Sequence, residues 1–444
     1  MLITPIRWVL LPKMKDKLFF MSLSRYSGDA YKNKKFNFYF DMAYLFLLPI
    51  FGFYMLNKSI RNTGKIIHSS ILIEAISLKY KNSTMSALVD ELADEDVRFV
   101  GRGLDCDGIA DNQFLRSDAW RIIFTGWLIF PYVLILTLFG KASLGRALLK
   151  TIVVYYRGYR FFQFNSTDVF VTIKDNACSA ALYSAFHSSG GVCLCAIQNG
   201  LRFGIEGINF ACFDHLFANT KRSVEVYRMG GGKIKAYDIV PTLSLDRYLE
   251  DSITIDDIDI DIDILFIDQG FPVNGLEMWL PANTGKDILK FLDQAKEFAI
   301  NNSKLKIVYL MRKYEEDLEY IRNAIEKWAK DTGIILSNPH NSHQSYHIVQ
   351  HSKLVVTMYS TLGLEALSLG CDTLFFNLKD DKRLDACAAP YQHTLKDYQY
   401  FDKTLNNVLF HGMQTNKKVI DYYAPPGSAG GTKLIAEKIK QYVN

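Results

Sequence analysis

The residues best suited to chemistry lie in one stretch, KLVVTMYSTLGLEALSLGCDTLFFN, which runs from Lys353 to Asn377. Residues 354–356 are an apolar run that predicts a buried strand, residues 362–369 continue at helical spacing, and residues 373–376 form a second apolar run. Between the first strand and the helix, Tyr359, Ser360 and Thr361 form a hydroxyl-rich turn. The order strand, turn, helix, strand is that of a parallel βαβ unit.

Ser360 and Thr361 are predicted to occupy the amino end of this helix. There the first backbone N–H groups have no partner within the helix, and the helix dipole favours negative charge, so a phosphate would be held. Glu365 lies one turn further along, where its carboxylate can accept hydrogen bonds from the hydroxyls of a ribose. Together these groups fit a nucleotide-sugar. The alternative is an ordinary Ser/Thr helix cap followed by a solvated glutamate.

Two segments resemble a known family. The pattern S-T-x-x-x-E-A-L-x-x-G after an apolar strand resembles the donor-site segment of GT-B glycosyltransferases, particularly those of bacterial surface-polysaccharide (capsule, O-antigen or lipopolysaccharide) biosynthesis. Gln198-Asn199-Gly200, with Arg202 two residues further on, resembles the Q-H-G or Q-N-G turn that faces the interdomain cleft in the same enzymes. The resemblance implies an α/β protein with two Rossmann-like domains facing a cleft, and transfer without a metal or another cofactor.

Alternation of strands and helices supports a parallel, doubly wound sheet in each half of the chain. The elements predicted for the first half are helices at 66–78, 84–92, 177–188 and 220–229, and strands at 97–100, 169–173, 192–197, 214–218 and 234–240. Those predicted for the second half, besides the unit around position 360, are strands at 264–267, 306–310 and 334–336, and helices at 286–301, 315–332, 398–408 and 433–443.

These elements predict a domain order for the 444 residues, a length that suits two domains. Residues 1–65 form a basic, aromatic region, 66–245 an acceptor-side domain, 246–263 an acidic linker and 264–425 a nucleotide-sugar domain. Residues 426–444 form a terminal helix that packs back on the first domain. In the linker, Asp257, Asp259, Asp261 and Asp263 alternate with isoleucine, which favours a solvated strand face over the metal-binding D-x-D of a GT-A enzyme.

Several candidates for catalysis and phosphate binding lie where predicted strands end, the place at which parallel sheets bind ligands. If transfer inverts the sugar, a general base must reach the acceptor hydroxyl, and Glu206, Asp175 and Asp268 are the candidates. Asp268 is followed by a polar turn, Gln269-Gly270.

Basic residues near the predicted donor site are candidates for neutralising its phosphates. Arg312 and Lys313 stand where many of the resembled enzymes carry a His-Pro pair, and His340 precedes a predicted helix. On that helix His343, His347 and His351 recur every four residues, a spacing that suits either a zinc site or the polar side of an amphipathic helix.

The composition of the chain indicates which binding partners and which cellular compartment to expect. A net charge of only +4, without a basic stripe, argues against nucleic acid. Seven cysteines without a regular framework predict reduced thiols in a cytoplasmic protein. Apolar stretches at 42–56 and 122–140, with nearby lysines, predict association with the cytoplasmic face of the inner membrane, with a membrane span by 122–140 as the alternative.

The function expected from these features is a glycosyltransferase. It would move a sugar from a nucleotide-sugar donor to a lipid-linked or growing surface glycan. CMP-linked acidic sugars are the donors expected first. The alternatives are a glycerol- or ribitol-phosphate transferase and a non-catalytic scaffold subunit that binds nucleotide or glycan.

Overall fold

The computed structural model describes the chain from residue 66 onward, with gaps. Residues 1–65, 75–84, 101–118 and 132–153 lie outside the described residues, as do internal segments of which the longest are 203–210, 252–260, 269–284, 312–318 and 378–386. The predictions for residues 1–65, for 42–56 and for most of 122–140 therefore fall outside the described part of the chain.

The first half of the chain forms a six-stranded sheet in the order β2-β1-β3-β4-β5-β6, and every neighbouring pair is parallel. Its strands are β1 (Ile67–Glu74), β2 (Val97–Val100), β3 (Asn165–Thr172), β4 (Cys193–Ile197), β5 (Cys212–Ala218) and β6 (Lys233–Ile239). The helices of this half are α5 (Ser86–Glu91), α8 (Ala180–Ser188), α9 (Lys221–Met229) and α10 (Leu243–Glu250), with further helical residues at 119–121, 123–125, 127–128, 131 and 154–164.

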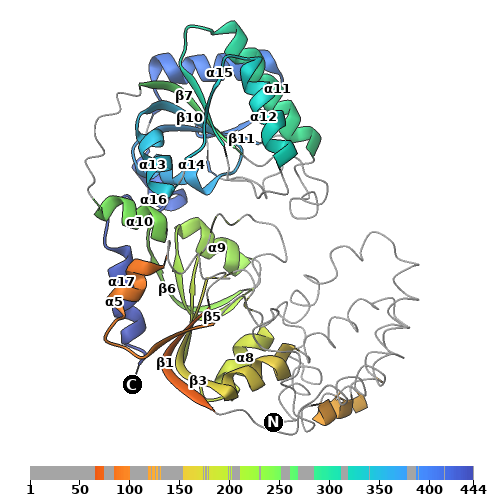
Figure 1. Ribbon diagram of the computed structural model, residues 1–444, viewed down its shortest axis with the longest axis vertical. Coiled ribbons are helices and arrows are strands. Elements are labelled where there is room, and N and C mark those ends of the chain that lie inside the picture. Colours follow the sequence, from red (N-terminus) through yellow and green to blue (C-terminus); the bar gives the residue numbers. More distant parts are fainter. Residues whose placement is uncertain are drawn as a thin grey trace.

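The second half forms another six-stranded parallel sheet, in the order β12-β11-β10-β7-β8-β9. Its strands are β7 (Ile262–Ile267), β8 (Ile307–Leu310), β9 (Ile335–Ser337), β10 (Ser352–Thr357), β11 (Asp372–Asn377) and β12 (Gln392–Thr394). Its helices are α11 (Gly285–Asn301), α12 (Glu319–Lys330), α13 (Ser342–Gln350), α14 (Thr361–Ser368), α15 (Tyr398–His411), α16 (Lys417–Tyr423) and α17 (Gly431–Lys440). Figure 1 shows the two sheets as separate domains, one above the other.

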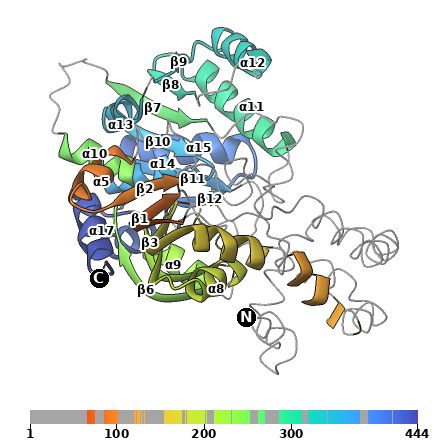
Figure 2. The same ribbon diagram turned by 60° about the horizontal axis from the view of Figure 1, so that its bottom comes forward.

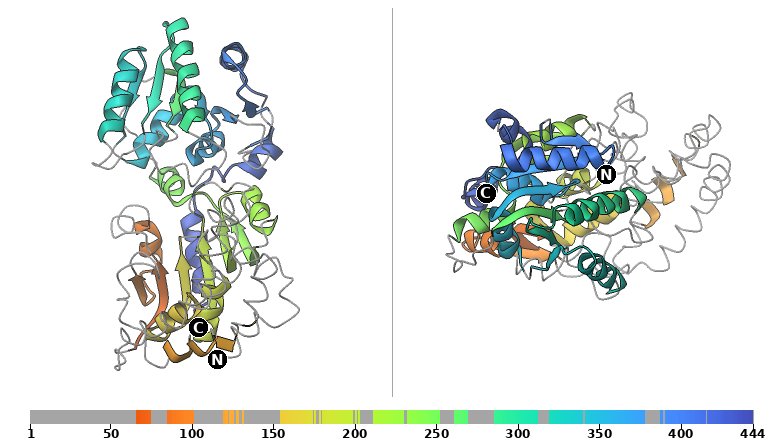
Figure 3. Two further views of the ribbon diagram at one scale, coloured as in Figure 1. Left: turned by 90° about the vertical axis from the view of Figure 1, so that its right-hand side faces the viewer. Right: turned by 90° about the horizontal axis from the view of Figure 1, so that it is seen from above.

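The central strands of both sheets are covered on both faces, which explains why these strands contain continuous apolar runs. In the second domain one core joins β7 and β10 to α11 and α15, and another joins the opposite face to α13 and α14. Figures 2 and 3 show these helix layers from other sides. The predicted fold class, two Rossmann-like domains, is confirmed.

One element was predicted wrongly. A helix was expected over 66–78, but residues 67–74 form β1, which lies between β2 and β3. Ile71, Leu72 and Ile73 are all fully buried, so consecutive side chains pack on both faces of the sheet. A continuous apolar run of this kind does not distinguish a central parallel strand from a buried helix. Helices α10 and α16 and strand β12 were not predicted.

The terminal helix α17 packs on the first domain, although the chain reaches it from the second. Ile435, Ala436 and Ile439 join the core formed by β1, β3 and β4. The amino end of α17 is capped from a distance, because the buried Asp246 of α10 accepts hydrogen bonds from the backbone N–H of Gly431 (2.9 Å) and Thr432 (2.6 Å). The first residues of the acidic linker expected over 246–263 thus belong to α10, and Asp246 caps α17.

Replacing this cap is expected to loosen α17. Asp246→Ala leaves two buried amides without an acceptor, and we expect it to lower the free energy of unfolding by about 2–4 kcal/mol. Urea unfolding measures the loss. Asp90→Ala, which removes an exposed carboxylate from α5 in the same domain, is the control and is expected to change stability little. Equal stability of the two variants would contradict the capping role.

No helix among the described residues has both the length and the apolarity needed to cross a membrane.

Candidate functional site

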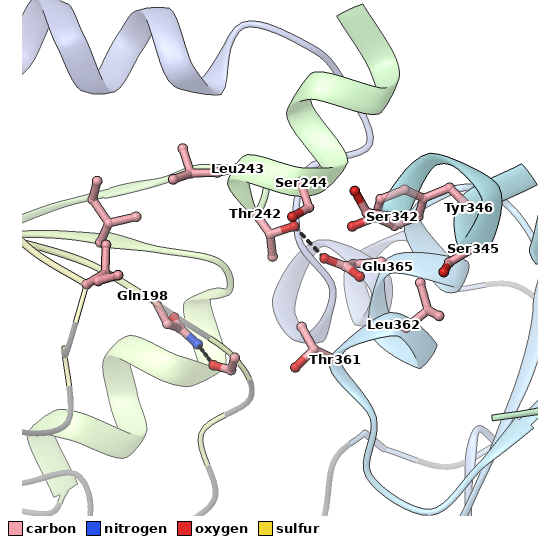
Figure 4. A pocket seen from close by; sticks show the side chains of 13 residues that line it. Gln198, Thr242, Leu243, Ser244, Ser342, Ser345, Tyr346, Thr361, Leu362 and Glu365 are labelled. Carbon is pink, nitrogen blue, oxygen red and sulfur yellow. Dashed lines mark hydrogen bonds between the residues drawn. The ribbon is translucent and has the colours of Figure 1, made fainter. Parts of the chain in front are cut away.

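A pocket of about 320 Å³ lies between the two domains, and residues of both line it (Figure 4). This volume is at the lower end of the range for small-molecule sites. From the first domain the lining includes residues after β4 and at the start of α10, and from the second it includes residues of α13 and α14. The lining residues are Ile173, Ile197, Gln198, Gly200, Thr242, Leu243, Ser244, Ser342, Ser345, Tyr346, Thr361, Leu362 and Glu365.

Helix α14 begins at this pocket, as the sequence predicts. Ser360 is its N-cap, and the Ser360 Oγ accepts a hydrogen bond from the Leu362 N–H at 3.2 Å. Thr361 and Leu362 of the first turn line the pocket. Gly363 lets the helix lie close to the sheet, since an added Cβ would stand 2.6 Å from the Thr357 Cγ2. The positive end of the helix dipole therefore faces the space between the domains.

Glu365 is a buried carboxyl group at the boundary between the domains, with 5% of its surface exposed. Its Oε1 accepts a hydrogen bond of 2.5 Å from the hydroxyl of Thr242, which belongs to the first domain (Figure 4). Burial raises the pKa of Glu365 to about 7, while hydrogen bonds from Thr242 and Tyr346 lower it. Of the described residues that line the pocket, it alone carries a carboxyl group.

Thr242 connects the two domains because its hydroxyl donates to Glu365 of the second domain while it also caps a helix of the first. The oxygen accepts a hydrogen bond from the Leu245 N–H at 3.2 Å, which makes Thr242 the N-cap of α10. Its single proton is then donated to Glu365. Because Thr242 is the donor in this hydrogen bond, Glu365 is the acceptor, as an ionised carboxylate must be.

The loop after β4 faces α14 across the pocket. Gly200 has φ +93°, a conformation that favours glycine, and a Cβ at this position would lie 3.6 Å from the Thr361 Oγ1. The side chain of Gln198 holds the loop in place. Its Nε2 donates to the Gly200 carbonyl at 2.7 Å and to the Ser223 Oγ at 3.0 Å, and its Oε1 accepts from the Asn219 N–H at 2.9 Å.

Arg202 and Asp175 form a buried ion pair behind this loop. The Arg202 guanidinium binds both carboxylate oxygens of Asp175, one of them through Nε at 2.9 Å. The Tyr227 hydroxyl donates to the same carboxylate at 2.5 Å. Although burial lowers the pKa of Arg202, the adjacent Asp175 raises it above its ordinary value. Both residues thus brace the loop, and neither is among the described residues that line the pocket.

The other predicted site residues are placed as follows. Asp268 directly follows β7, is buried, and accepts a hydrogen bond from the Tyr309 hydroxyl at 2.7 Å. It is not among the described residues that line the pocket. Tyr359 is partly buried and packs against the core of the second domain. The remaining predicted residues, Asn199, Glu206, Gln269, Gly270, Arg312, Lys313 and His340, lie outside the described residues.

The histidines of α13 and of its C-cap, His351, take part in other contacts. The His343 Nε2 lies 3.2 Å from the Asp251 Oδ2, and the ring of His347 stacks on that of His351 with centroids 4.2 Å apart. Within the described part of the chain, no group of three or more His, Cys, Asp or Glu side chains is arranged to hold a metal ion.

Several pocket residues were not predicted, namely Thr242, Ser244, Ser342, Ser345 and Tyr346. A usable signal existed for Thr242, since it follows β6 and so lies at the carboxyl end of a strand, where such sheets bind ligands. Ser342 has the same signal, because it begins α13 after the carboxyl end of β9, whereas Ser345 and Tyr346 lie further along the helix and have none. They reach the pocket only because α13 packs beside α10, and the two helices are distant in sequence.

Solved structures with the same architecture cover most of the chain. A structure of S. aureus MnaA with UDP aligns over 85% of this chain and 97% of its own, with TM-score 0.50 and 14% identity. The Methanocaldococcus jannaschii UDP-GlcNAc 2-epimerase, in complex with UDP-GlcNAc and UDP, aligns over 85% of this chain and 100% of its own, with TM-score 0.50 and 12% identity. The chain therefore has the two-domain GT-B fold. No protein-family model matches it, and no curated protein does.

The raised pKa of Glu365 predicts a pH dependence of stability. The folded protein holds a proton on Glu365 between pH 4.5, the ordinary value, and about 7, whereas the unfolded chain releases it. Stability must therefore fall as pH rises through this window. Between pH 5 and pH 8 the free energy of unfolding should fall by roughly 2–3 kcal/mol more for the wild type than for Glu365→Gln.

Urea unfolding of both proteins at the two pH values measures this difference. All other titrating groups are shared, so they cancel in the comparison. Parallel pH profiles would show that Glu365 does not titrate in this range.

Proposed function

We propose that the protein is an enzyme that acts on a nucleotide-sugar and, within that class, a glycosyltransferase. It transfers the sugar to a lipid-linked or growing surface glycan, such as capsule, O-antigen or lipopolysaccharide. One observation supports this most strongly. The amino end of α14 and the Glu365 carboxyl group face the glycine loop of the opposite domain across a pocket. That arrangement suits a ligand that is anionic at one end and rich in hydroxyls at the other.

Different pocket residues suit the phosphates and the ribose of such a ligand. Negative phosphate oxygens are favoured at the first turn of α14, where Thr361 adds a hydroxyl and charge on the departing nucleotide is stabilised. A carboxylate has about four lone-pair sites, so Glu365 can accept from ribose hydroxyls while it keeps Thr242 as a partner. Ser244, Ser342 and Ser345 supply further hydroxyls on the same wall.

The general base remains a prediction. Asp175 is held by an ion pair with Arg202 and a hydrogen bond from Tyr227, which makes it the least suited of the three. Asp268, with one hydrogen bond from Tyr309, and Glu206 remain the candidates. The uridine ligands of both solved structures make UDP-sugars the first donors to test, ahead of CMP-linked acidic sugars.

A second function is an epimerase that converts one nucleotide-sugar into another that differs in configuration at one carbon of the sugar. The shared fold with a UDP-GlcNAc 2-epimerase over 85% of this chain favours it. The two functions differ in their need for an acceptor, because epimerisation proceeds with the nucleotide-sugar alone. Transfer requires a glycan or lipid-linked sugar and releases the nucleotide.

Incubation with nucleotide-sugars, with and without a lipid-linked glycan acceptor, separates these functions. We expect UDP release that depends on the acceptor and a longer glycan product. A new nucleotide-sugar formed without acceptor would establish the epimerase. Release of CMP from a CDP-linked alditol would establish alditol-phosphate transfer, and binding of nucleotide without any turnover would establish a scaffold.

The role of Glu365 can be tested by removing its expected partner. UDP and 2′,3′-dideoxy-UDP are each titrated calorimetrically into the wild type and into Glu365→Gln. Loss of hydrogen bonds to a charged group predicts about a 10–100-fold weaker affinity for UDP in the variant. The dideoxy ligand should bind both proteins equally weakly, since it has no diol to lose.

Asp90→Ala serves as the control for a carboxylate that lies elsewhere in the fold. If Glu365→Gln weakened both ligands by the same factor, the carboxylate would act elsewhere than on the ribose.

A further inference from the structure

The helical residues described between 119 and 128 include four large apolar side chains that face water. Trp120, Phe124, Trp127 and Leu128 keep 55%, 58%, 60% and 50% of their surface exposed. At the 100° per residue of an α-helix, the spacing of these four positions corresponds to an arc of about 100°. We call this surface the aromatic arc.

The opposite side of the same helix attaches it to the first domain. Ala119, Ile123 and Thr125 are buried, and the Thr125 Oγ1 lies 3.3 Å from the Tyr156 hydroxyl in the helix at 154–164. The orientation is therefore set by packing. A surface helix of a soluble protein normally places polar residues outward, whereas here the outward side is aromatic and aliphatic.

The size of the arc limits what can cover it. Its four side chains expose roughly 400–500 Å² of mainly apolar surface, which is near the largest patches on ordinary monomers. A stable dimer needs about 800 Å² per partner, so a second copy of the chain would be poorly held by this surface alone.

The chemistry of the arc suits a lipid bilayer. Two tryptophans combine an apolar body with an N–H donor, as residues at the boundary between lipid and water do. In the sequence, residues 122–140 contain no charged side chain, and Arg121 and Lys141 flank them. An uncharged run of this kind places no ionised group against the acyl chains.

We propose that the aromatic arc docks the protein on a lipid bilayer. In the setting predicted from the sequence, this is the cytoplasmic face of the inner membrane. The helix lies at the end of the first domain remote from the second domain (Figures 1 and 3). Docking there leaves the pocket between the domains accessible from water. Membrane docking by this surface does not depend on which reaction the pocket performs.

Flotation of the full chain with phosphatidylcholine vesicles, with and without phosphatidylglycerol, tests the proposal. We expect the wild type to float with both. The variant Phe124→Glu plus Trp127→Glu places charges in the arc and should lower the bound fraction at least about tenfold. The matched control is Phe410→Glu, which changes an aromatic residue that is 71% exposed on α15 of the second domain, and it should bind like the wild type.

A second measurement does not depend on charged variants. Vesicles of brominated phosphatidylcholine should quench the tryptophan emission of the wild type. They should quench Trp120→Phe plus Trp127→Phe less, although this variant keeps an apolar arc and still floats. Failure of the wild type to bind either vesicle would overturn the proposal. So would equal binding by Phe124→Glu plus Trp127→Glu, or a dimer that this variant abolishes without any vesicle binding.

Discussion

The hydrogen bond between Thr242 and Glu365 is the interaction on which the arrangement of the site depends. It joins a threonine that starts a helix of one domain to a carboxyl group buried in the other. Because Glu365 is buried, its charged form is stable only while hydrogen-bond donors remain around it. The candidate site and the contact between the domains thus use the same two side chains.

Other contacts hold the domains in register on both sides of this bond. Helix α10 lies against α13, where the Tyr248 hydroxyl donates to Gln350 at 2.5 Å and the Tyr248 ring packs on Tyr346. Between α16 and α9, the Tyr422 hydroxyl donates to Glu225. These contacts are polar or aromatic and few of them are buried, so the domains can shift relative to each other at modest cost. A ligand in the pocket would contact both domains and add to the forces that hold them together.

The sequence predicted the parts of this structure that are specified locally. The unit β10–α14–β11 has apolar strands, an N-cap at Ser360 and a helix end at Gly370, which has φ +84°. Each of these signals acts over a few residues, so the element and its direction could be read directly. Gln198 and Gly200 were found in the same way, as a turn at the end of a strand.

The features that were missed are those that depend on contacts between distant residues. Asp175 was considered as a base because it follows a strand, but its partner Arg202 is 27 residues away and converts it into a brace. Glu365 was assigned to ribose alone, since Thr242 lies 123 residues earlier in the chain. Strand β1 was misread as a helix because its burial on both faces follows from its neighbours in the sheet, which local periodicity does not report.

An experimental structure of the protein with UDP bound would show where the nucleotide lies. We expect the ribose hydroxyls within hydrogen-bond distance of Glu365 and the phosphates at the first turn of α14, opposite Gly200. UDP bound outside the space between the domains, or with its phosphates away from α14, would contradict this expectation.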